Sequence, residues 1–150
     1  MRLTDYTDYT LRVLIYCASN PSRRVTISEI ADAYSISRNH LTKIVHELGR
    51  QGVLETSRGR GGGLRLLRAP SQITVGEIVR AAETDFALVE CFDRRTNRCR
   101  LTPHCRLRRA LKRALDAYLA ELDGVTIEDI SVRTTSGGRS LPMIATPGPG

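Results

Sequence analysis

Short helices separated by turn residues dominate the first fifty residues, and this pattern restricts the folds open to the chain. Apolar residues recur there three or four positions apart, as they do along one face of an α-helix. The spacing predicts helices over about 4–19, 26–33 and 38–51. Ser37 is placed to cap the third helix, and either Thr26 or Ser28 the second, because a hydroxyl oxygen can accept the free N–H groups of a first turn. A mainly α chain is therefore expected.

A hairpin is predicted directly after the third of these helices. Strand-like runs at 53–57 and 64–67 flank a glycine-rich basic tip at 58–63. Two short helices, a tight turn and a third helix followed by a hairpin are typical of a winged helix-turn-helix domain, which places its third helix in the major groove of double-stranded DNA. A nucleotide-binding loop is excluded, because these glycines precede a strand and do not open a helix.

The polar face of the third helix and the tip of the hairpin suit DNA contacts. Arginine and asparagine can each bond two atoms of a base in the major groove, whereas a glycine-rich wing can approach the backbone and place an arginine in the minor groove. The residues expected to contact DNA are Ser28, Ser37, Arg38, Asn39, His40, Thr42, Lys43, Arg58, Arg60, Gly61 and Gly62. Lys and Arg outnumber Asp and Glu by 23 to 16, which favours a polyanionic partner. A solvated helix face would explain any one of these side chains, but several in register favour DNA binding.

Two further helices and a tail are expected downstream. One helix spans about 74–83, and a longer one begins with Thr102 as cap and Pro103 as first helical residue and closes at Gly124. The longer helix carries an apolar stripe of Leu107, Leu111, Leu115, Tyr118 and Leu122. Such a stripe must pack on the chain's own core or on a second copy, and the length of the helix favours a homodimer.

These elements suggest four units along the chain. The expected units are a DNA-binding domain at 1–84, a cysteine loop at 85–102, a dimerisation helix with a short terminal helix at 103–133 and a disordered tail at 134–150. The tail is expected to be disordered because it is rich in Gly, Pro, Ser and Thr and has little apolar content.

Three of the four cysteines, Cys91, Cys99 and Cys105, lie within fifteen residues of one another, whereas Cys17 lies mid-helix and is expected to be a small core residue. No apolar run is long enough to cross a bilayer and no signal-peptide core opens the chain, so we expect a cytoplasmic protein with reduced thiols and no membrane partner.

Close C-x-x-C pairs of the kind used by structural zinc are absent, and the wider spacing of the three cysteines suits an iron–sulfur cluster. Cys105 is expected to be the third residue of its helix, near the positive end of the helix dipole. His104 is a poor fourth ligand, because neighbours on a helix do not face one point.

Four segments carry a likeness to a known family: LTDYTDY at 3–9, SRNHLTKIV at 37–45, RGRGGGLRL at 58–66 and LTPHCRL at 101–107. With these segments the chain resembles, from residue 1 to about 130, the NsrR-type nitric-oxide-responsive repressors, which are relatives of the IscR iron–sulfur regulators.

The resemblance implies a homodimer that binds an inverted-repeat operator and carries an iron–sulfur cluster. Its implied ligands are Cys91, Cys99 and Cys105 of one subunit and Asp8 of the other. A 4Fe–4S cluster suits three thiolates and one carboxylate, and a 2Fe–2S cluster is the alternative. Nitric oxide is the implied effector, with loss or nitrosylation of the cluster releasing the operator.

Two features depart from the family pattern, and two other sensors stay open. The interval between Cys91 and Cys99 is longer than is typical, and Arg108 stands where IscR-like proteins carry a histidine, which argues against the IscR branch. Without the resemblance, Asp8 is a first-turn acid that complements the helix dipole. A zinc-dependent or a thiol-redox winged-helix regulator is the alternative function. An enzyme is not expected, because no nucleophile, base and orienting group form a recognisable set.

Overall fold

The computed structural model describes residues 2–101 and 104–132. The elements along the chain are α1 (Asp5–Ala18), α2 (Ile27–Tyr34), α3 (Arg38–Arg50), β1 (Leu54–Ser57), β2 (Gly63–Leu66), η1 (Pro70–Gln72), α4 (Val75–Ala82), η2 (Glu90–Phe92), α5 (Arg106–Asp123) and α6 (Ile127–Ile130). The three helices and the hairpin expected in the first 67 residues are present, and the mainly α prediction is confirmed. The expected tail at 134–150 and the expected helix start at Thr102 and Pro103 lie outside the described residues.

Hydroxyl side chains cap α1 to α4 and α6, so local sequence sets where these helices begin. At α2 the cap is Thr26 and not Ser28: the Glu29 N–H donates to Thr26 Oγ1 at 3.2 Å, and the Thr26 N–H donates to Glu29 Oε2 at 2.6 Å. Ser37 caps α3 as expected, because its hydroxyl oxygen accepts the N–H of His40 at 3.3 Å.

One apolar core joins α1 to α4, the hairpin and α6, and we call this part of the molecule the head. Its largest fully buried side chains include Leu14, Ile30, Leu41, Ile44, Leu54, Ile73, Ile78 and Ile127. Cys17 lies in this core, as expected, and burial raises the pKa of its thiol to about 12. The core therefore draws on residues from both the first 84 and the last 30 described positions.

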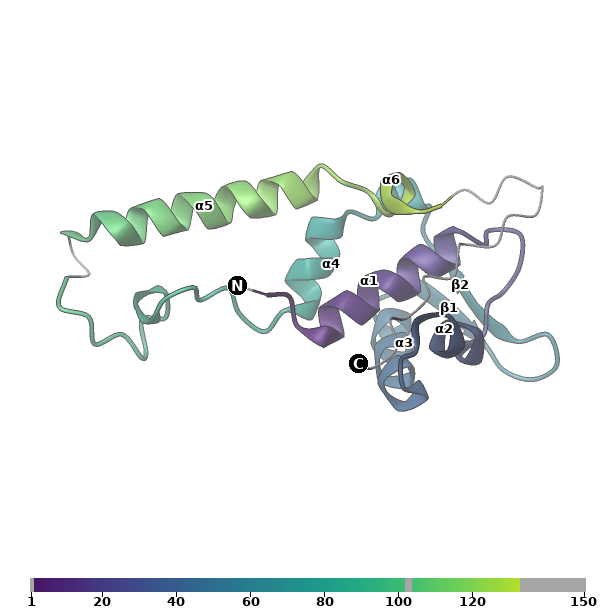
Figure 1. Ribbon diagram of the computed structural model, residues 1–150. Helices are drawn as coiled ribbons and strands as arrows, with labels where there is room; N and C mark the ends of the chain where they lie inside the picture. The colour runs from purple at the N-terminus through teal and green to yellow at the C-terminus, as the bar shows by residue number, and fades with distance from the viewer. Residues whose placement is uncertain (1, 102–103, 133–150) are drawn as a thin grey trace, which may run out of the picture.

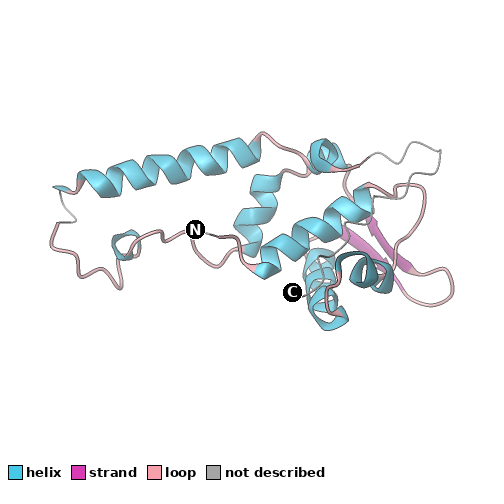
Figure 2. Ribbon diagram, viewed as in Figure 1, coloured by secondary structure: helices cyan, strands magenta, loops and turns pink. Residues whose placement is uncertain are grey.

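The hairpin is held to the rest of the head by a third segment of chain. Strands β1 and β2 pair antiparallel from Leu54 opposite Leu66 to Ser57 opposite Gly63. Val25, which precedes α2, exchanges two backbone hydrogen bonds with Leu64, of 3.0 and 2.7 Å. The wing is thus anchored beside the start of α2 (Figure 2).

Helix α5 projects away from the head, and the loop that carries Cys91 and Cys99 extends in the same direction before joining its first turn (Figure 1). At its other end α6 returns the chain to the head, where the Ile127 N–H donates to the Ile73 carbonyl at 2.8 Å. None of the described helices is long and apolar enough to span a membrane.

The apolar stripe on α5 divides into two parts. Leu115 is buried, and Leu122 packs against the core of the head together with Leu119 on the same side. Leu107, in the first turn, is 64% exposed. The chain's own packing therefore explains the second half of the stripe but leaves the side chain of Leu107 in the first turn largely exposed.

Candidate nucleic-acid interface and cysteine site

The first turns of α3 form an exposed polar surface. Leu41, Ile44 and other apolar residues of α3 face the core, which leaves the opposite side of the helix in solvent. Arg38, Asn39 and Lys43 are all exposed on that side. The structure therefore brings together, on one accessible helix face, the side chains that were expected to read bases and bind phosphates.

Two of the other expected contact residues on α2 and α3 have partners of their own, and a third is half-buried. The Thr42 hydroxyl donates to the Arg38 carbonyl at 2.8 Å, so its oxygen can still accept a hydrogen bond but its hydrogen is engaged. The His40 ring lies against Tyr9 of α1, with ring centroids 6.2 Å apart and planes inclined by 36°. Ser28 lies half-buried in the first turn of α2.

The tip of the wing requires glycine at two positions. Gly61 has a φ of +76°, a conformation that other residues adopt at a cost. A Cβ added to Gly62 would lie 2.4 Å from the carbonyl oxygen of Ser57, so the turn closes only without a side chain there. Arg58 and Arg60 are exposed at this tip. The wing therefore presents two arginines on a tight loop, as the sequence predicted.

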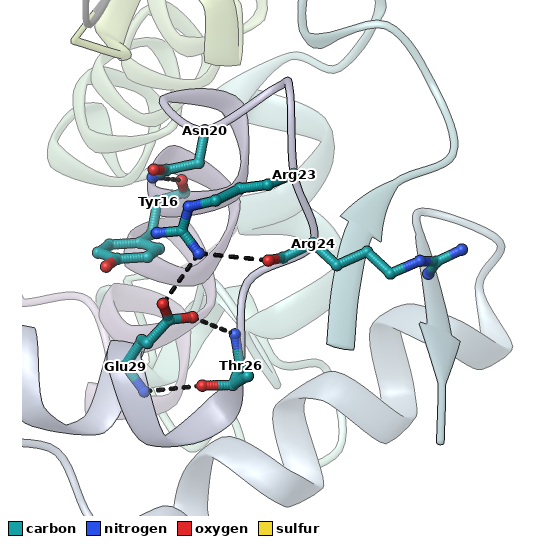
Figure 3. A network of polar contacts seen from close by, with 6 residues as sticks. All are labelled: Tyr16, Asn20, Arg23, Arg24, Thr26 and Glu29. Atoms are coloured by element: carbon teal, nitrogen blue, oxygen red, sulfur yellow. Dashed lines mark hydrogen bonds and ion pairs between the residues drawn. The ribbon is translucent and has the colours of Figure 1, made fainter. Parts of the chain in front are cut away.

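Two arginines and a capping network hold the base of the wing and the turn before α2. Glu55 of β1 accepts from Arg24 at 2.8 Å and also pairs with Arg65 of β2, and these hydrogen bonds lower the pKa of Glu55. Figure 3 shows the turn before α2, where Arg23 donates to Glu29 at 2.9 Å while the Arg24 side chain extends away from this network. The position of the wing relative to α2 is thus fixed by ion pairs as well as by the backbone.

The cysteines of the loop lie in partly protected positions. None of the four cysteines, all of which the structure describes, is in a disulfide; Cys91 is buried in η2, whereas Cys99 and Cys105 are half-buried. The Cys99 N–H donates to the Asn97 side chain at 2.9 Å, which shapes the turn in front of that cysteine.

Cys105 is not the third residue of α5, and that expectation is wrong. It is the N-cap: its Sγ accepts the N–H of Arg108 at 3.3 Å, and the first helical residue is Arg106. The Cys105 sulfur has the N-capping role that the sequence predicts for Thr102. A sulfur three residues before an N–H group with no partner inside the helix can accept a hydrogen bond from that group. The Arg108 side chain also reaches back to the loop, where its Nε donates to the carbonyl oxygen of Cys91 at 3.1 Å.

Asp8 lies in the first turn of α1, where its carboxylate pairs with Arg12. The two side chains make contacts of 2.8 Å and 3.1 Å, and the Arg12 guanidinium also lies 5.7 Å from the centre of the Tyr34 ring. Asp8 is therefore linked through Arg12 to the end of α2.

The donor types at this site fit an iron–sulfur cluster, but one chain does not assemble a complete site. Thiols are the preferred ligands of such clusters, and three cysteines that are not in disulfides lie between 91 and 105. Within the described residues, no three His, Cys, Asp or Glu side chains are placed to hold a metal ion.

The positive charge of the chain is concentrated around these cysteines. Nine basic residues and no acid occur between 94 and 113: Arg94, Arg95, Arg98, Arg100, Arg106, Arg108, Arg109, Lys112 and Arg113. The whole chain contains 23 basic and 16 acidic residues, so the part outside this segment has 14 basic and 16 acidic residues. The segment is thus suited to keep an anionic group close to the thiols.

A contact between α1 and the end of α4 was not predicted from the sequence. The Glu83 carboxylate accepts from the Thr4 N–H at 2.8 Å and from the Thr4 hydroxyl at 3.2 Å, which ties the start of α1 to the end of α4. These two residues are 79 positions apart, so no local pattern could have indicated the contact.

Comparisons with known proteins agree with this arrangement. A family model named Rrf2 and described as an iron-dependent transcriptional regulator matches residues 3–133. The HTH-type transcriptional regulator NsrR of Bacillus licheniformis is 54% identical over 131 residues, which cover 87% of this chain and 92% of that protein. The protein of the same name from Bacillus subtilis strain 168 is 52% identical, with 87% and 90% covered.

Solved structures show the same fold. CymR of B. subtilis, described as its global cysteine regulator, superposes with a TM-score of 0.72 at 27% identity, covering 87% of this chain and 96% of that one. IscR of T. potens superposes with a TM-score of 0.70 at 20% identity, covering 87% and 85%, a likeness of fold alone. The winged-helix prediction is confirmed, and because these relatives are transcriptional regulators the chain is a DNA-binding regulator and not an enzyme. The chain belongs to the Rrf2 family of transcriptional regulators.

Proposed function

We propose that this chain represses transcription as a cytoplasmic homodimer on an inverted-repeat operator, and that nitric oxide releases it from DNA through an iron–sulfur cluster. The ligands are Cys91, Cys99 and Cys105 of one subunit and Asp8 of the partner subunit. The observation that carries the proposal is the contact of one residue, Arg108, with both Cys91 and Cys105, in a chain whose family is described as iron-dependent.

The DNA-binding part of the proposal is supported by the head. Helix α3 and the hairpin of β1 and β2 lie on the side of the head away from α5 (Figure 1). The polar residues of α3 and the two arginines of the wing are exposed to solvent. Paired heads in a dimer require two half-sites about one helical turn, or a multiple, apart, which is why an inverted repeat is the operator proposed. Relatives at 44–54% identity carry the name NsrR, which supports repression controlled by nitric oxide.

The cluster part of the proposal is supported by the donor set and the surrounding charge. Three thiolates and one carboxylate supply four terminal ligands, the number that both 4Fe–4S and 2Fe–2S clusters take, and the form proposed here is 4Fe–4S with 2Fe–2S as the alternative. When bound, the cluster supplies an iron centre that reacts with nitric oxide. The chain's own residues supply the anionic donors, the surrounding cations and a protected position for Cys91, which is 7% exposed.

The dimer is supported by the exposed Leu107 in the first turn of α5 and by the position of Asp8. Leu107 is an exposed apolar residue in the first turn of α5. This turn lies at the end of α5 that is farther from the head (Figure 1). A second subunit that covers this turn would bring its own head close to the loop. The partner's Asp8 would then leave or share its contact with Arg12.

The contacts of α1 provide a route from the cysteine site to the recognition helix. Arg12 joins Asp8 to Tyr34 at the end of α2, and Tyr9 contacts His40 on α3. A movement of the first turn of α1 therefore acts on both helices of the helix-turn-helix. A change of a few kcal/mol between two positions of the heads is enough to empty an operator.

The test is an anaerobic gel-shift titration with cluster-loaded protein and an inverted-repeat operator. Loaded protein should shift the operator, and nitric oxide should abolish the shift. Equal binding by cluster-free protein would refute the sensing model. Stoichiometric zinc in a colourless protein would select the zinc alternative, and metal-free protein with reversible disulfides under strict anaerobiosis would select the thiol-redox alternative.

Matched variants test the ligands. Cys99→Ala should abolish the visible absorbance of the cluster, whereas Cys17→Ala should leave it unchanged because Cys17 lies in the core of the head. Asp8→Ala should perturb the spectrum, whereas Asp5→Ala, which removes an exposed acid from the same turn, should not. Identical spectra for the two aspartate variants would remove Asp8 from the ligand set.

A further inference from the structure

Arg108 differs from every other basic residue around the cysteines. Of the nine basic residues between 94 and 113, all of which the structure describes, Arg108 is the one that is not exposed. Its Nε donates to the Cys91 carbonyl at 3.1 Å across 17 positions of sequence, and its backbone N–H donates to Cys105 Sγ at 3.3 Å. The other eight basic side chains are exposed to solvent, whereas the Arg108 side chain bonds to the backbone of the cysteine loop.

The two bonds of Arg108 act on different cysteines through different atoms. The backbone N–H holds the thiol of Cys105 as the cap of α5, and any residue at position 108 other than proline would retain this bond. The side chain makes the other bond, in which Nε of the guanidinium donates to the Cys91 carbonyl and ties the Cys91 segment to the first turn of α5. A side-chain substitution therefore releases Cys91 and leaves the capping of Cys105 in place.

We propose that Arg108 is a positioning residue that holds Cys91 close to Cys105 before any metal binds. The bond closes the segment from 91 to 108, and a closed loop loses less conformational freedom when its thiols are gathered around one centre. A hydrogen bond from a guanidinium to a carbonyl oxygen is also stronger than one between neutral groups. Arg108 thus holds two of the three thiols, those of Cys91 and Cys105, in place in the cluster-free chain. Its role towards the cluster rests on the function proposed above.

The first experiment uses the cluster-free full-length chain. The rate of alkylation by iodoacetamide is followed at each cysteine by mass spectrometry in the wild type, in Arg108→Ala and in Arg109→Ala. Arg109 is the matched control, because it is the next residue of α5, carries the same charge and is exposed. Arg108→Ala should accelerate alkylation of Cys91 about tenfold, the factor expected when one hydrogen bond from a charged donor is lost. Arg109→Ala should leave the rate unchanged.

The other cysteines distinguish a local release from general unfolding. Cys105 keeps its backbone donor and Cys17 lies in the core of the head, so neither should react faster in Arg108→Ala. Equal acceleration at Cys17 and Cys91 would show that the variant merely destabilises the fold and would overturn the proposal. An unchanged rate at Cys91 would overturn it as well.

The second experiment measures cluster uptake after anaerobic addition of ferrous iron and sulfide. Visible absorbance should develop more slowly and reach a lower value in Arg108→Ala than in the wild type and Arg109→Ala. Equal uptake by all three proteins would show that the contact exists without a positioning role. If even the wild type takes up no iron, the proposed function fails by itself, and the alkylation rates still decide whether Arg108 holds Cys91.

Discussion

Replacing Ile127 by alanine should destabilise the protein far more than replacing Ile130, although both belong to the four-residue helix α6. Ile127 is 0% exposed and lies in the core of the head, whereas Ile130 is 38% exposed. The Ile127 N–H also donates to the Ile73 carbonyl at 2.8 Å, so its side chain is inserted where α6 joins the chain before α4. The two variants therefore remove the same type of side chain from a buried position and from a partly exposed position of one helical turn.

The magnitude follows from the atoms removed. The change from isoleucine to alanine deletes three carbon groups, and at about 0.8 kcal/mol for each buried group the loss of transfer free energy is about 2.4 kcal/mol. The cavity left at a fully enclosed position adds to this loss, so we expect the Ile127 variant to lose about 3 kcal/mol of unfolding free energy. We expect about 1 kcal/mol for Ile130→Ala, because a partly exposed side chain buries less surface and leaves no closed cavity.

Urea unfolding followed by circular dichroism measures both losses. With a slope of about 2 kcal/mol per molar urea, the midpoint should fall by about 1.5 M for Ile127→Ala and by about 0.5 M for Ile130→Ala. All proteins are compared at one concentration, since association would make stability depend on it. Equal midpoint shifts for the two variants would refute the reasoning, because α6 would then not be anchored through Ile127.

Three further predictions concern the wing, the pH dependence of stability and the core thiol. Gly62→Ala should weaken operator binding in fluorescence anisotropy, because the new Cβ would lie 2.4 Å from the Ser57 carbonyl oxygen and force the tip open; unchanged affinity would show that the tip makes no contact with DNA. The backbone N–H of Thr26 donates to the Glu29 carboxylate and lowers its pKa in the folded protein. This hydrogen bond therefore stabilises the folded state fully above the unfolded-state pKa of about 4.3, and the stabilisation is lost as the pH falls through the lower folded-state pKa. Glu29→Gln should therefore flatten the acid side of a curve of melting temperature against pH, and an unaltered curve would contradict this assignment. Because burial raises the pKa of Cys17 to about 12, this thiol should stay unmodified by iodoacetamide at pH 8 while the half-buried Cys99 and Cys105 react; mass spectrometry that finds Cys17 modified at the same rate as these two would refute its place in the core.

Local sequence determined most of the head. The caps Thr26 and Ser37 act on backbone groups three residues away, and the apolar spacing along α1 and α3 decides which face of each helix is buried. The glycine tip of the wing is likewise defined by neighbouring residues. These features could be predicted because each depends on atoms only a few positions apart in the chain.

Tertiary structure alone decided how the cysteine site is joined to the rest of the protein. Sequence placed Cys105 inside a helix, but the fold makes its sulfur the cap of α5 and brings the Arg108 side chain to the Cys91 carbonyl. The contact of Glu83 with Thr4 and the burial of Ile127 also join segments that are far apart in sequence. Such contacts depend on how the whole chain closes, since a hydrogen bond between distant residues forms only after the elements between them have packed.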